Sequence, residues 1–307
     1  MQVYDLIIIG SGPAGLTAGL YAGRYGLPTL ILEKNFIGGQ IILSPAIENF
    51  PGFPGGIKTD SLIGNIRKQV EDLGIKIEMC EVLRIELDKQ KKKIITQEQV
   101  FETKSLIIAT GAYPKKLGAI GEEKFIARGV SYCGTCDGPL FKDKEICVVG
   151  GGDRALEEAL YLTTYANKVN LIHRRDEFRG SSILKKEIER NNKINVILDS
   201  VIEEINGEDK ISSVKIKNVK NDKQIILKCD GVFIFVGIHP NTELAKSLLH
   251  LDKDGFIITD QEMRTSSEGI FAAGDCRKSA LWQVITACGD GAIAAYSAHQ
   301  YAVSYNR

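Results

Sequence analysis

Two glycine-rich turns of the same kind constrain this chain most strongly. The first, Gly-Ser-Gly-Pro-Ala-Gly at 10–15, directly follows the apolar run 4–9, and the second, Gly-Gly-Gly-Asp-Arg-Ala at 150–155, follows the apolar run 145–149. A buried strand, a glycine turn and a helix form the start of a βαβ unit, whose turn lets the backbone approach a pyrophosphate closely. The repeat therefore predicts an α/β chain of 307 residues with two dinucleotide-binding domains.

The side chains that end the second strand of each unit predict different nucleotides. In the first unit the expected strand 29–33 ends in Glu33, which lies 23 residues after Gly10 and can accept hydrogen bonds from ribose hydroxyls. In the second unit no acid ends the strand, and the sequence places there the basic side chains of His173, Arg174, Arg175 and Arg179. Cations at this position accommodate a 2′-phosphate, which favours NADP(H) over NAD(H). The alternative is a solvated basic turn.

Two further apolar strands lead out of the expected domains. They span residues 105–111 and 231–237, and Pro114 and Pro240 follow them. Beyond the second proline, the sequence predicts only a short strand at 269–275 and a small-residue helix at 283–302, which is too little for a separate core. We therefore expect a discontinuous first domain made of 1–113 and 243–307, with a second domain, 116–240, inserted into it.

Cys133 and Cys136 are the only closely spaced pair among seven cysteines. A pair at this spacing can close a small disulfide ring and open it again. A zinc site is the alternative, but zinc needs about four ligands, and the sequence offers no second Cys or His pair at ligand spacing. The neighbouring carboxylate of Asp137 can exchange protons with a thiolate, cap the following turn, or do both.

The composition excludes several classes of protein. Lys and Arg number 39 and Asp and Glu also number 39, so the formal net charge is zero and no basic excess points to nucleic acid. No apolar stretch approaches the roughly 18 residues of a membrane-spanning helix, and the N-terminus lacks the pattern of a secretory signal. We expect a cytoplasmic protein with no nucleic-acid or membrane partner.

Nine motifs follow one another in a characteristic order. They are GSGPAG at 10–15, GGQ at 38–40, ENFPG at 48–52, ATGA at 109–112, CGTCDG at 133–138, GGGDRALEEA at 150–159, HRRDEFR at 173–179, GIFAAGDCR at 269–277 and QVITACGDGAIAA at 283–295. Through these motifs the chain resembles the low-molecular-weight, bacterial-type thioredoxin reductases over nearly its whole length. The resemblance implies two Rossmann-like, three-layer (ββα) domains: an FAD domain made of both chain ends, and an inserted NADPH domain that carries the cysteine pair.

The resemblance also implies roles for individual residues. Gly10, Gly12 and Glu33 would hold the adenosine half of FAD, and the further flavin contacts would be Ser11, Pro13, Ala14, Gly39, Gln40, Asn49, Ala109, Gly111, Gly274, Asp275, Gln283 and Val284. The NADPH contacts would be Gly150, Gly152, Asp153, Arg154, His173, Arg174, Arg175 and Arg179. Cys136 would lie next to the flavin, Cys133 would attack the disulfide of thioredoxin, and Asp137 would protonate the leaving thiolate.

The implied reaction is a thioredoxin-disulfide reduction. A hydride passes from NADPH to FAD, and the electrons pass to the Cys133–Cys136 disulfide and then to thioredoxin by dithiol–disulfide exchange. The resemblance further implies a homodimer and a rotation of the inserted domain. The alternatives are a flavoprotein of the same fold with ferredoxin as donor or with another acceptor, and a non-catalytic FAD-binding scaffold. The cysteine pair and Asp137 count against the scaffold.

Two residues depart from the family pattern. Arg154 stands in the second phosphate loop where a small residue, usually Ser, is common, and it either adds a cation to the pyrophosphate or fills its place. Trp282, the only tryptophan, stands where the family commonly has Arg, and it packs as an aromatic, stacks near the flavin or blocks a partner surface. Because His173, Arg174 and Arg175 are retained, NADPH remains the expected donor.

Overall fold

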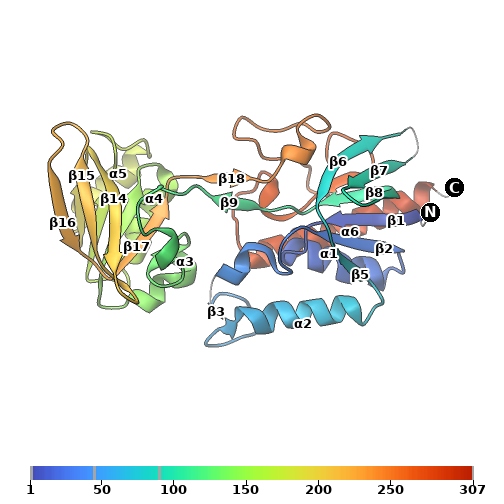
Figure 1. Cartoon of the computed structure of the whole chain (residues 1–307), viewed down its shortest axis with the longest axis horizontal. Helices are drawn as coiled ribbons and strands as arrows, with labels where there is room; N and C mark the ends of the chain where they lie inside the picture. Colours follow the sequence, from blue (N-terminus) through green and yellow to red (C-terminus); the bar gives the residue numbers. More distant parts are fainter. Residues whose placement is uncertain (1–2, 44–45, 89–90, 306–307) are drawn as a thin grey trace. The chain divides into compact units, whose positions relative to one another are not determined.

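The chain folds as two compact units, each with its own sheet (Figure 1). The computed structural model describes residues 3–43, 46–88 and 91–305. The first unit comprises 1–113 and 239–307, and the second comprises 114–238. We expected the first unit to resume at 243, but residues 239–242 belong to it, because Asn241 donates hydrogen bonds to the carbonyls of Thr110 and Gly111.

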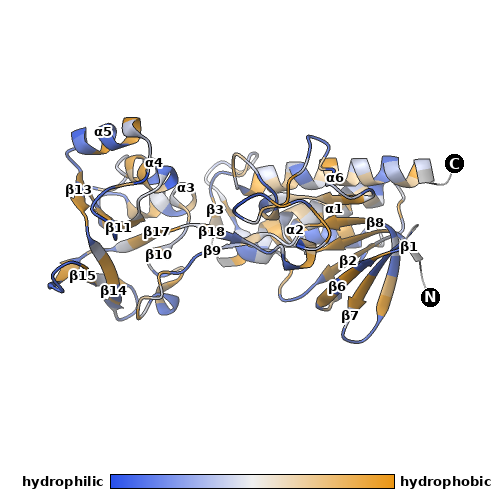
Figure 2. Cartoon of the chain, turned by 90° about the horizontal axis from the view of Figure 1, so that it is seen from above, coloured by the Kyte–Doolittle hydropathy of each residue, from blue (hydrophilic) through white to orange (hydrophobic). Residues whose placement is uncertain are grey.

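The first unit is built on a seven-stranded sheet in the order β5-β2-β1-β8-β7-β6, with β19 paired to β8. Its parallel strands are β1 (Val3–Ile9), β2 (Thr29–Glu33), β5 (Lys76–Met79), β8 (Val100–Ile108) and β19 (Ile270–Ala272). The antiparallel strands are β6 (Val82–Leu87) and β7 (Lys92–Thr96). A short hairpin pairs β3 (Ala46–Ile47) with β4 (Ile57–Lys58). The strands at the centre of the sheet are continuous apolar runs, as expected of parallel strands covered on both faces (Figure 2).

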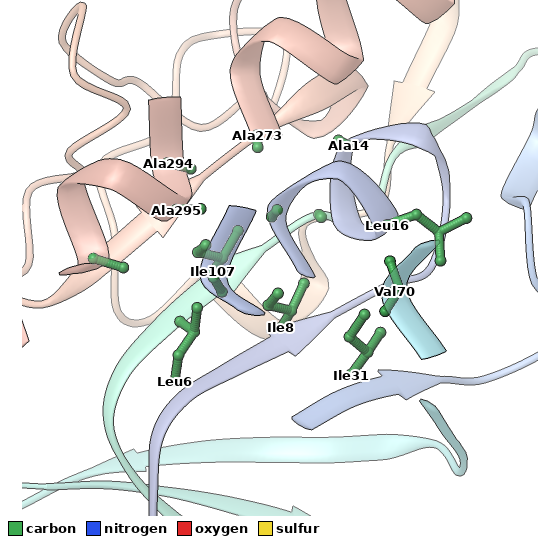
Figure 3. Close-up of a cluster of buried hydrophobic side chains, with 14 of the residues drawn as sticks. Leu6, Ile8, Ala14, Leu16, Ile31, Val70, Ile107, Ala273, Ala294 and Ala295 are labelled. Atoms are coloured by element: carbon green, nitrogen blue, oxygen red, sulfur yellow. The ribbon is translucent and has the colours of Figure 1, made fainter. Parts of the chain in front are cut away.

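Helices cover one face of this sheet. They are α1 (Pro13–Arg24), α2 (Thr59–Glu71) and α6 (Val284–Tyr305), with a 3₁₀ turn at Gly39–Leu43. Figure 3 shows the strand residues Ile8 and Ile107 facing α1 and α6, and Ile31 facing Val70 of α2. On the other face, Ile7 and Ile9 of β1 pack with Ile85 of β6 and Ile94 of β7. The unit therefore has three layers: the helices, the parallel strands, and the antiparallel strands β6 and β7, which continue the same hydrogen-bonded sheet beyond β8 and pack over its other face.

The second unit repeats this architecture. Its five-stranded parallel sheet has the order β10-β17-β11-β12-β13, and β14-β15-β16 form a separate antiparallel sheet. The strands are β10 (Val130–Ser131), β11 (Glu145–Gly150), β12 (Lys168–Ile172), β13 (Ile194–Ile197), β14 (Ser200–Gly207), β15 (Ile211–Asn218), β16 (Gln224–Lys228) and β17 (Gly231–Phe235). The helices are α3 (Gly134–Asp137), α4 (Asp153–Leu162) and α5 (Ser182–Arg190). One sheet face packs on α4 and α5, and the other packs on β14 and β15. The predicted fold class is thus confirmed.

The chain crosses between the units on two short strands. These strands, β9 (Ala112–Pro114) and β18 (Ile238–Pro240), pair with each other. They contain the two prolines at which the sequence predicted the crossings. No helix within the described residues is long and apolar enough to span a membrane.

The predicted strand 269–275 is wrong at its end. The strand stops at Ala272, and Gly274–Cys276 forms a 3₁₀ turn. Gly274 has a positive φ of 74°, a conformation that glycine adopts at no steric cost and that interrupts a strand. Asp275 therefore lies in a turn and does not end a strand.

A glycine of α6 allows this helix to approach α1. A Cβ built at Gly291 would lie 2.1 Å from the carbonyl oxygen of Ala14, whereas a Cβ at Gly289 would meet nothing within 4 Å. We expect Gly291→Ala to lower the free energy of unfolding by about 1–3 kcal/mol, because backbone has to move. The control Gly289→Ala should raise it by up to about 1 kcal/mol, since Ala favours the helix. Denaturant titration measures both, and equal effects would contradict the close contact.

Candidate nucleotide and redox sites

The three glycines of the first loop occupy three different environments. A Cβ at Gly10 would lie 2.3 Å from the Ala109 carbonyl oxygen, and one at Gly15 would lie 1.8 Å from the Gly10 carbonyl oxygen. A Cβ at Gly12 would meet nothing closer than 3.8 Å. Gly10 and Gly15 are therefore required for the tight turn and for helix–strand packing, and Gly12 leaves open space before the N-terminus of α1. This is the division of roles that pyrophosphate binding requires.

Glu33 is fixed beside this loop by three hydrogen bonds. The Ser11 backbone N–H and hydroxyl both donate to Oε2 at 2.8 Å, and the Asn35 N–H donates to Oε1 at 2.8 Å. The side chain is buried, at the ends of β1 and β2. Because a carboxylate has about four acceptor sites, it retains capacity for ribose hydroxyls. The structure thus joins two elements that are 22 residues apart in the sequence.

The second loop has the same geometry. A Cβ at Gly150 would lie 2.6 Å from the Phe235 carbonyl oxygen, whereas one at Gly152 would meet nothing within 4 Å. Asp153 begins α4, and its carboxylate accepts a 2.6 Å hydrogen bond from the Ser181 N–H. The loop therefore also leaves open space before a helix N-terminus.

The basic segment folds back on this second loop. The Arg179 N–H donates to the Gly151 carbonyl at 2.7 Å, and the His173 ring lies so close to Gly151 that a Cβ there would collide with it. Burial lowers the pKa of His173, and the charges of Arg179, Arg175 and Arg174 lower it further, so the ring is neutral at pH 7. The three arginine side chains are exposed. The exposed arginines of the segment therefore lie beside the second loop, and the neutral ring of His173 packs against Gly151.

Cys133 and Cys136 form a disulfide in the second unit, with Cα atoms 5.3 Å apart. Cys133 directly precedes α3, and Cys136 and Asp137 lie in it. The buried hydroxyl of Ser131 is 2.6 Å from Asp137 Oδ2 and accepts a 3.1 Å hydrogen bond from the Cys133 N–H. A carboxylate is therefore held next to a disulfide in the unit that also carries the second glycine loop and the basic segment.

Comparison with known proteins shows to which family the chain belongs. The family model described as pyridine nucleotide-disulphide oxidoreductase matches residues 4–291. The chain belongs to this family.

Relatives of the oxidoreductase include proteins named thioredoxin reductase. The one from Listeria innocua is 43% identical over 301 residues, which cover 98% of this chain and 94% of the relative. The crystal structure of thioredoxin reductase from Streptococcus pyogenes matches with a TM-score of 0.93 at 46% identity, covering 98% of this chain and 99% of that one. A ferredoxin-flavin thioredoxin reductase from Clostridium acetobutylicum matches at 32% identity with a TM-score of 0.54, covering 99% of each chain.

The other residues that the resemblance assigns to the flavin all lie in the first unit of the oxidoreductase. The Gly38 N–H donates to the Ser11 carbonyl at 2.9 Å, which brings Gly39 against Gly12. The Asn49 amide donates to Gln283 Oε1 at 3.0 Å, directly before α6. The remaining positions are Pro13 and Ala14 in α1, Gln40 in the 3₁₀ turn, Ala109 and Gly111 after β8, Gly274 and Asp275 after β19, and Val284 at the start of α6.

The two departures from the family pattern both make aromatic contacts. The Arg154 guanidinium lies over the Phe235 ring, 5.7 Å from its centroid. The Trp282 ring packs against Phe256 with centroids 5.4 Å apart, and its buried indole N–H has no hydrogen-bond partner among the residues described. Each side chain therefore makes a packing contact within its own unit.

Several supporting residues escaped the sequence reasoning. Ser131 is one, since a single serine at the end of the short strand β10 forms no recognisable sequence pattern. Glu122 is another: its buried carboxylate accepts hydrogen bonds from the Tyr132 hydroxyl at 2.7 Å and the Gly118 N–H at 2.8 Å. This fixes Tyr132, the neighbour of Cys133. Within 3–43, 46–88 and 91–305, no three His, Cys, Asp or Glu side chains cluster in a way that would hold a metal ion.

Proposed function

We propose that this oxidoreductase is an NADPH-dependent thioredoxin-disulfide reductase that holds FAD in the first unit and NADPH in the second. The observation that carries the proposal is the Cys133–Cys136 disulfide, with the Asp137 carboxylate held beside it by Ser131. The relatives named thioredoxin reductase and the order of the motifs support it.

The first unit fits the adenosine and pyrophosphate parts of FAD. Gly12 leaves room for a pyrophosphate, and Glu33 is oriented by Ser11 with acceptor sites to spare. When bound, FAD would supply the means to accept a hydride and to pass on two electrons. Asn49 and Gln283, which are hydrogen-bonded to each other, would contact the flavin on the side of α6.

The chain's own side chains carry out the exchange with thioredoxin. Reduction of the Cys133–Cys136 disulfide takes two electrons and two protons and yields two thiols. Asp137 takes the proton of the Cys133 thiol, and the resulting thiolate attacks the thioredoxin disulfide, forming a mixed disulfide and releasing one thioredoxin thiolate, to which Asp137 passes the proton. The Cys136 thiol then attacks the Cys133 sulfur and restores the disulfide, and its proton passes to the second thioredoxin sulfur, which leaves as a thiol. Ser131 holds Asp137 in place for this proton transfer.

Three exposed arginines favour NADPH over NADH and over a ferredoxin donor. Arg174, Arg175 and Arg179 lie on the segment that folds over the second glycine loop, where a 2′-phosphate would be bound. A ferredoxin donor would need no such cations.

An anaerobic titration of the yellow protein with NADPH and then NADH tests the donor. We expect NADPH to bleach the flavin at much lower concentration, and the reduced protein to reduce thioredoxin. If dithionite bleaches the flavin but neither nucleotide does, the protein does not use NADPH. The departures at Arg154 and Trp282 would then explain the loss, and ferredoxin should be tested as the donor.

Arg175→Ala should raise the KM for NADPH by roughly tenfold and that for NADH by far less, because a charged hydrogen bond contributes about 1.5–3 kcal/mol. Steady-state kinetics with both nucleotides measure this difference. Lys228→Ala, which removes an exposed cation from β16, serves as the control and should change neither KM. An equal change for both nucleotides would refute the 2′-phosphate assignment.

We also propose that the protein works in the cytoplasm as a homodimer. The resemblance to bacterial-type thioredoxin reductases supports both statements. Light scattering of the purified holoenzyme measures its mass in solution, and a monomer at micromolar concentration would refute the dimer.

A further inference from the structure

Two glycines of the cysteine segment pack against α4. Gly134 and Gly138 are four residues apart, and so are Glu158 and Leu162, which face them. A Cβ at Gly134 would lie 2.0 Å from Glu158 Oε2, and one at Gly138 would lie 3.0 Å from Leu162 Cδ2. The absence of side chains at the two glycines therefore lets the segment that carries the disulfide lie directly on α4.

The Glu158 carboxyl is an unusual group for this contact. Its Oε2 atom is shielded from solvent and has no hydrogen-bond partner in the part of the chain that the structure describes. Leu162, one turn further on, shows that an apolar side chain serves the same packing role at Gly138. Because burying a carboxylate oxygen without a hydrogen-bond partner is costly, packing alone does not account for an acid here.

The charges around Glu158 leave the carboxyl poorly compensated. Burial is the largest influence and raises its pKa, and the neighbouring carboxylate of Glu157 raises it further. The charge of the Arg154 guanidinium and a backbone hydrogen bond from Gly134 lower the pKa, but within the described residues no donor meets Oε2 in full hydrogen-bond geometry. On α3 the other acid is Asp137, which is held by Ser131. Glu158 thus becomes charged at a higher pH than an exposed glutamate does.

We propose that Glu158 is a positioning residue that sets the redox equilibrium of the Cys133–Cys136 pair by placing a negative charge against Gly134, between the two cysteines. The disulfide is neutral. Adding two electrons and one proton gives one thiol and one thiolate, and the thiolate is repelled by a nearby carboxylate. The Glu158 charge therefore destabilises only the reduced form and makes the pair a stronger reductant. The inference rests on the proposed function only in taking the pair to be redox-active.

Glu158→Gln tests this with little change in size. The holoenzyme is equilibrated at pH 8.5 with mixtures of oxidised and reduced dithiothreitol, and Cys133 and Cys136 are then alkylated and quantified by mass spectrometry. We expect the equilibrium to shift toward the dithiol by roughly tenfold, which is about 30 mV for a two-electron couple. The matched control is Glu157→Gln, an exposed acid on the same helix, which should shift it by less than about twofold because solvent screens its charge. Equal shifts in the two variants would overturn the proposal.

Lower pH separates charge from packing. At about pH 4 the Glu158 carboxyl, whose pKa is raised above its ordinary value, is largely protonated and has no charge with which to repel a thiolate, so wild type and Glu158→Gln should give the same equilibrium. A difference that persists in acid would mean that the substitution acts through packing, which contradicts the proposal.

A double-mutant cycle covers the case in which Glu158→Gln folds poorly. Gly134→Ala should destabilise the wild type, because its Cβ displaces the carboxyl, and should cost clearly less in a Glu158→Ala background. Additive effects on thermal unfolding would show that the two residues do not interact, and would overturn the proposal. None of these measurements uses NADPH or thioredoxin, so a failure of the proposed function would be seen separately.

Discussion

Replacement of Cys136 by Ser is expected to abolish thioredoxin reduction, lowering kcat by more than about a thousandfold. Cys136 is disulfide-bonded to Cys133, and without its sulfur the pair cannot store two electrons. The mixed disulfide with thioredoxin would also have no second thiol to resolve it. NADPH should still bleach the flavin, because the glycine loops and the basic segment are untouched.

The separation of these two effects is the decisive result for Cys136. Stopped-flow absorbance measures flavin reduction, and a coupled thioredoxin assay measures turnover. Cys80→Ser is the matched control, since Cys80 is a free, partly exposed cysteine of the first unit, and this variant should turn over normally. Normal thioredoxin turnover by Cys136→Ser would refute the proposed function.

Glu33→Ala should yield a protein that purifies largely without flavin, with FAD bound roughly a hundredfold more weakly. The change removes the acceptor of the Ser11 and Asn35 hydrogen bonds and the group expected to bind the ribose. Leaving buried donors unpaired costs about 1–3 kcal/mol, and loss of a hydrogen bond to a charged group costs about 1.5–3 kcal/mol. A factor of ten in Kd corresponds to about 1.4 kcal/mol. A hundredfold weaker binding of FAD therefore corresponds to the lower end of these two costs added together.

The ratio of flavin to protein absorbance after purification, followed by titration with FAD, measures the effect. Glu71→Ala is the control: it removes an exposed acid of the same unit that pairs with Arg67 on α2, and the variant should retain full flavin. If Glu33→Ala also binds FAD as tightly as the wild type, the adenosine site lies elsewhere.

The sequence predicted those features that depend on residues close together in the chain. The glycine turns, Glu33 and the basic end of β12 follow from one strand–turn–helix pattern, so their positions could be predicted. The strands β14, β15 and β16 could not be predicted in this way, because their apolar residues pack on a face of the parallel sheet whose strands lie far away in the sequence. Ser131 and Glu158 escaped for a similar reason: each acts on the cysteine segment through a contact that exists only once β10, α3 and α4 have packed.

The pairing of β9 with β18 gives each unit neighbouring chain ends. Within the second unit the Lys115 N–H donates to the Gly237 carbonyl at 2.9 Å, and within the first the Asn241 N–H donates to the Gly111 carbonyl at 2.9 Å. A short linker could therefore join the two chain ends of one unit, and closing such a short loop has a small entropic cost. The second unit is continuous in sequence and its two ends lie side by side, so it has the geometry of a module that can be inserted into the first unit or removed from it. The disulfide, Asp137, the second glycine loop and the basic segment all lie in this one module and would be inserted together.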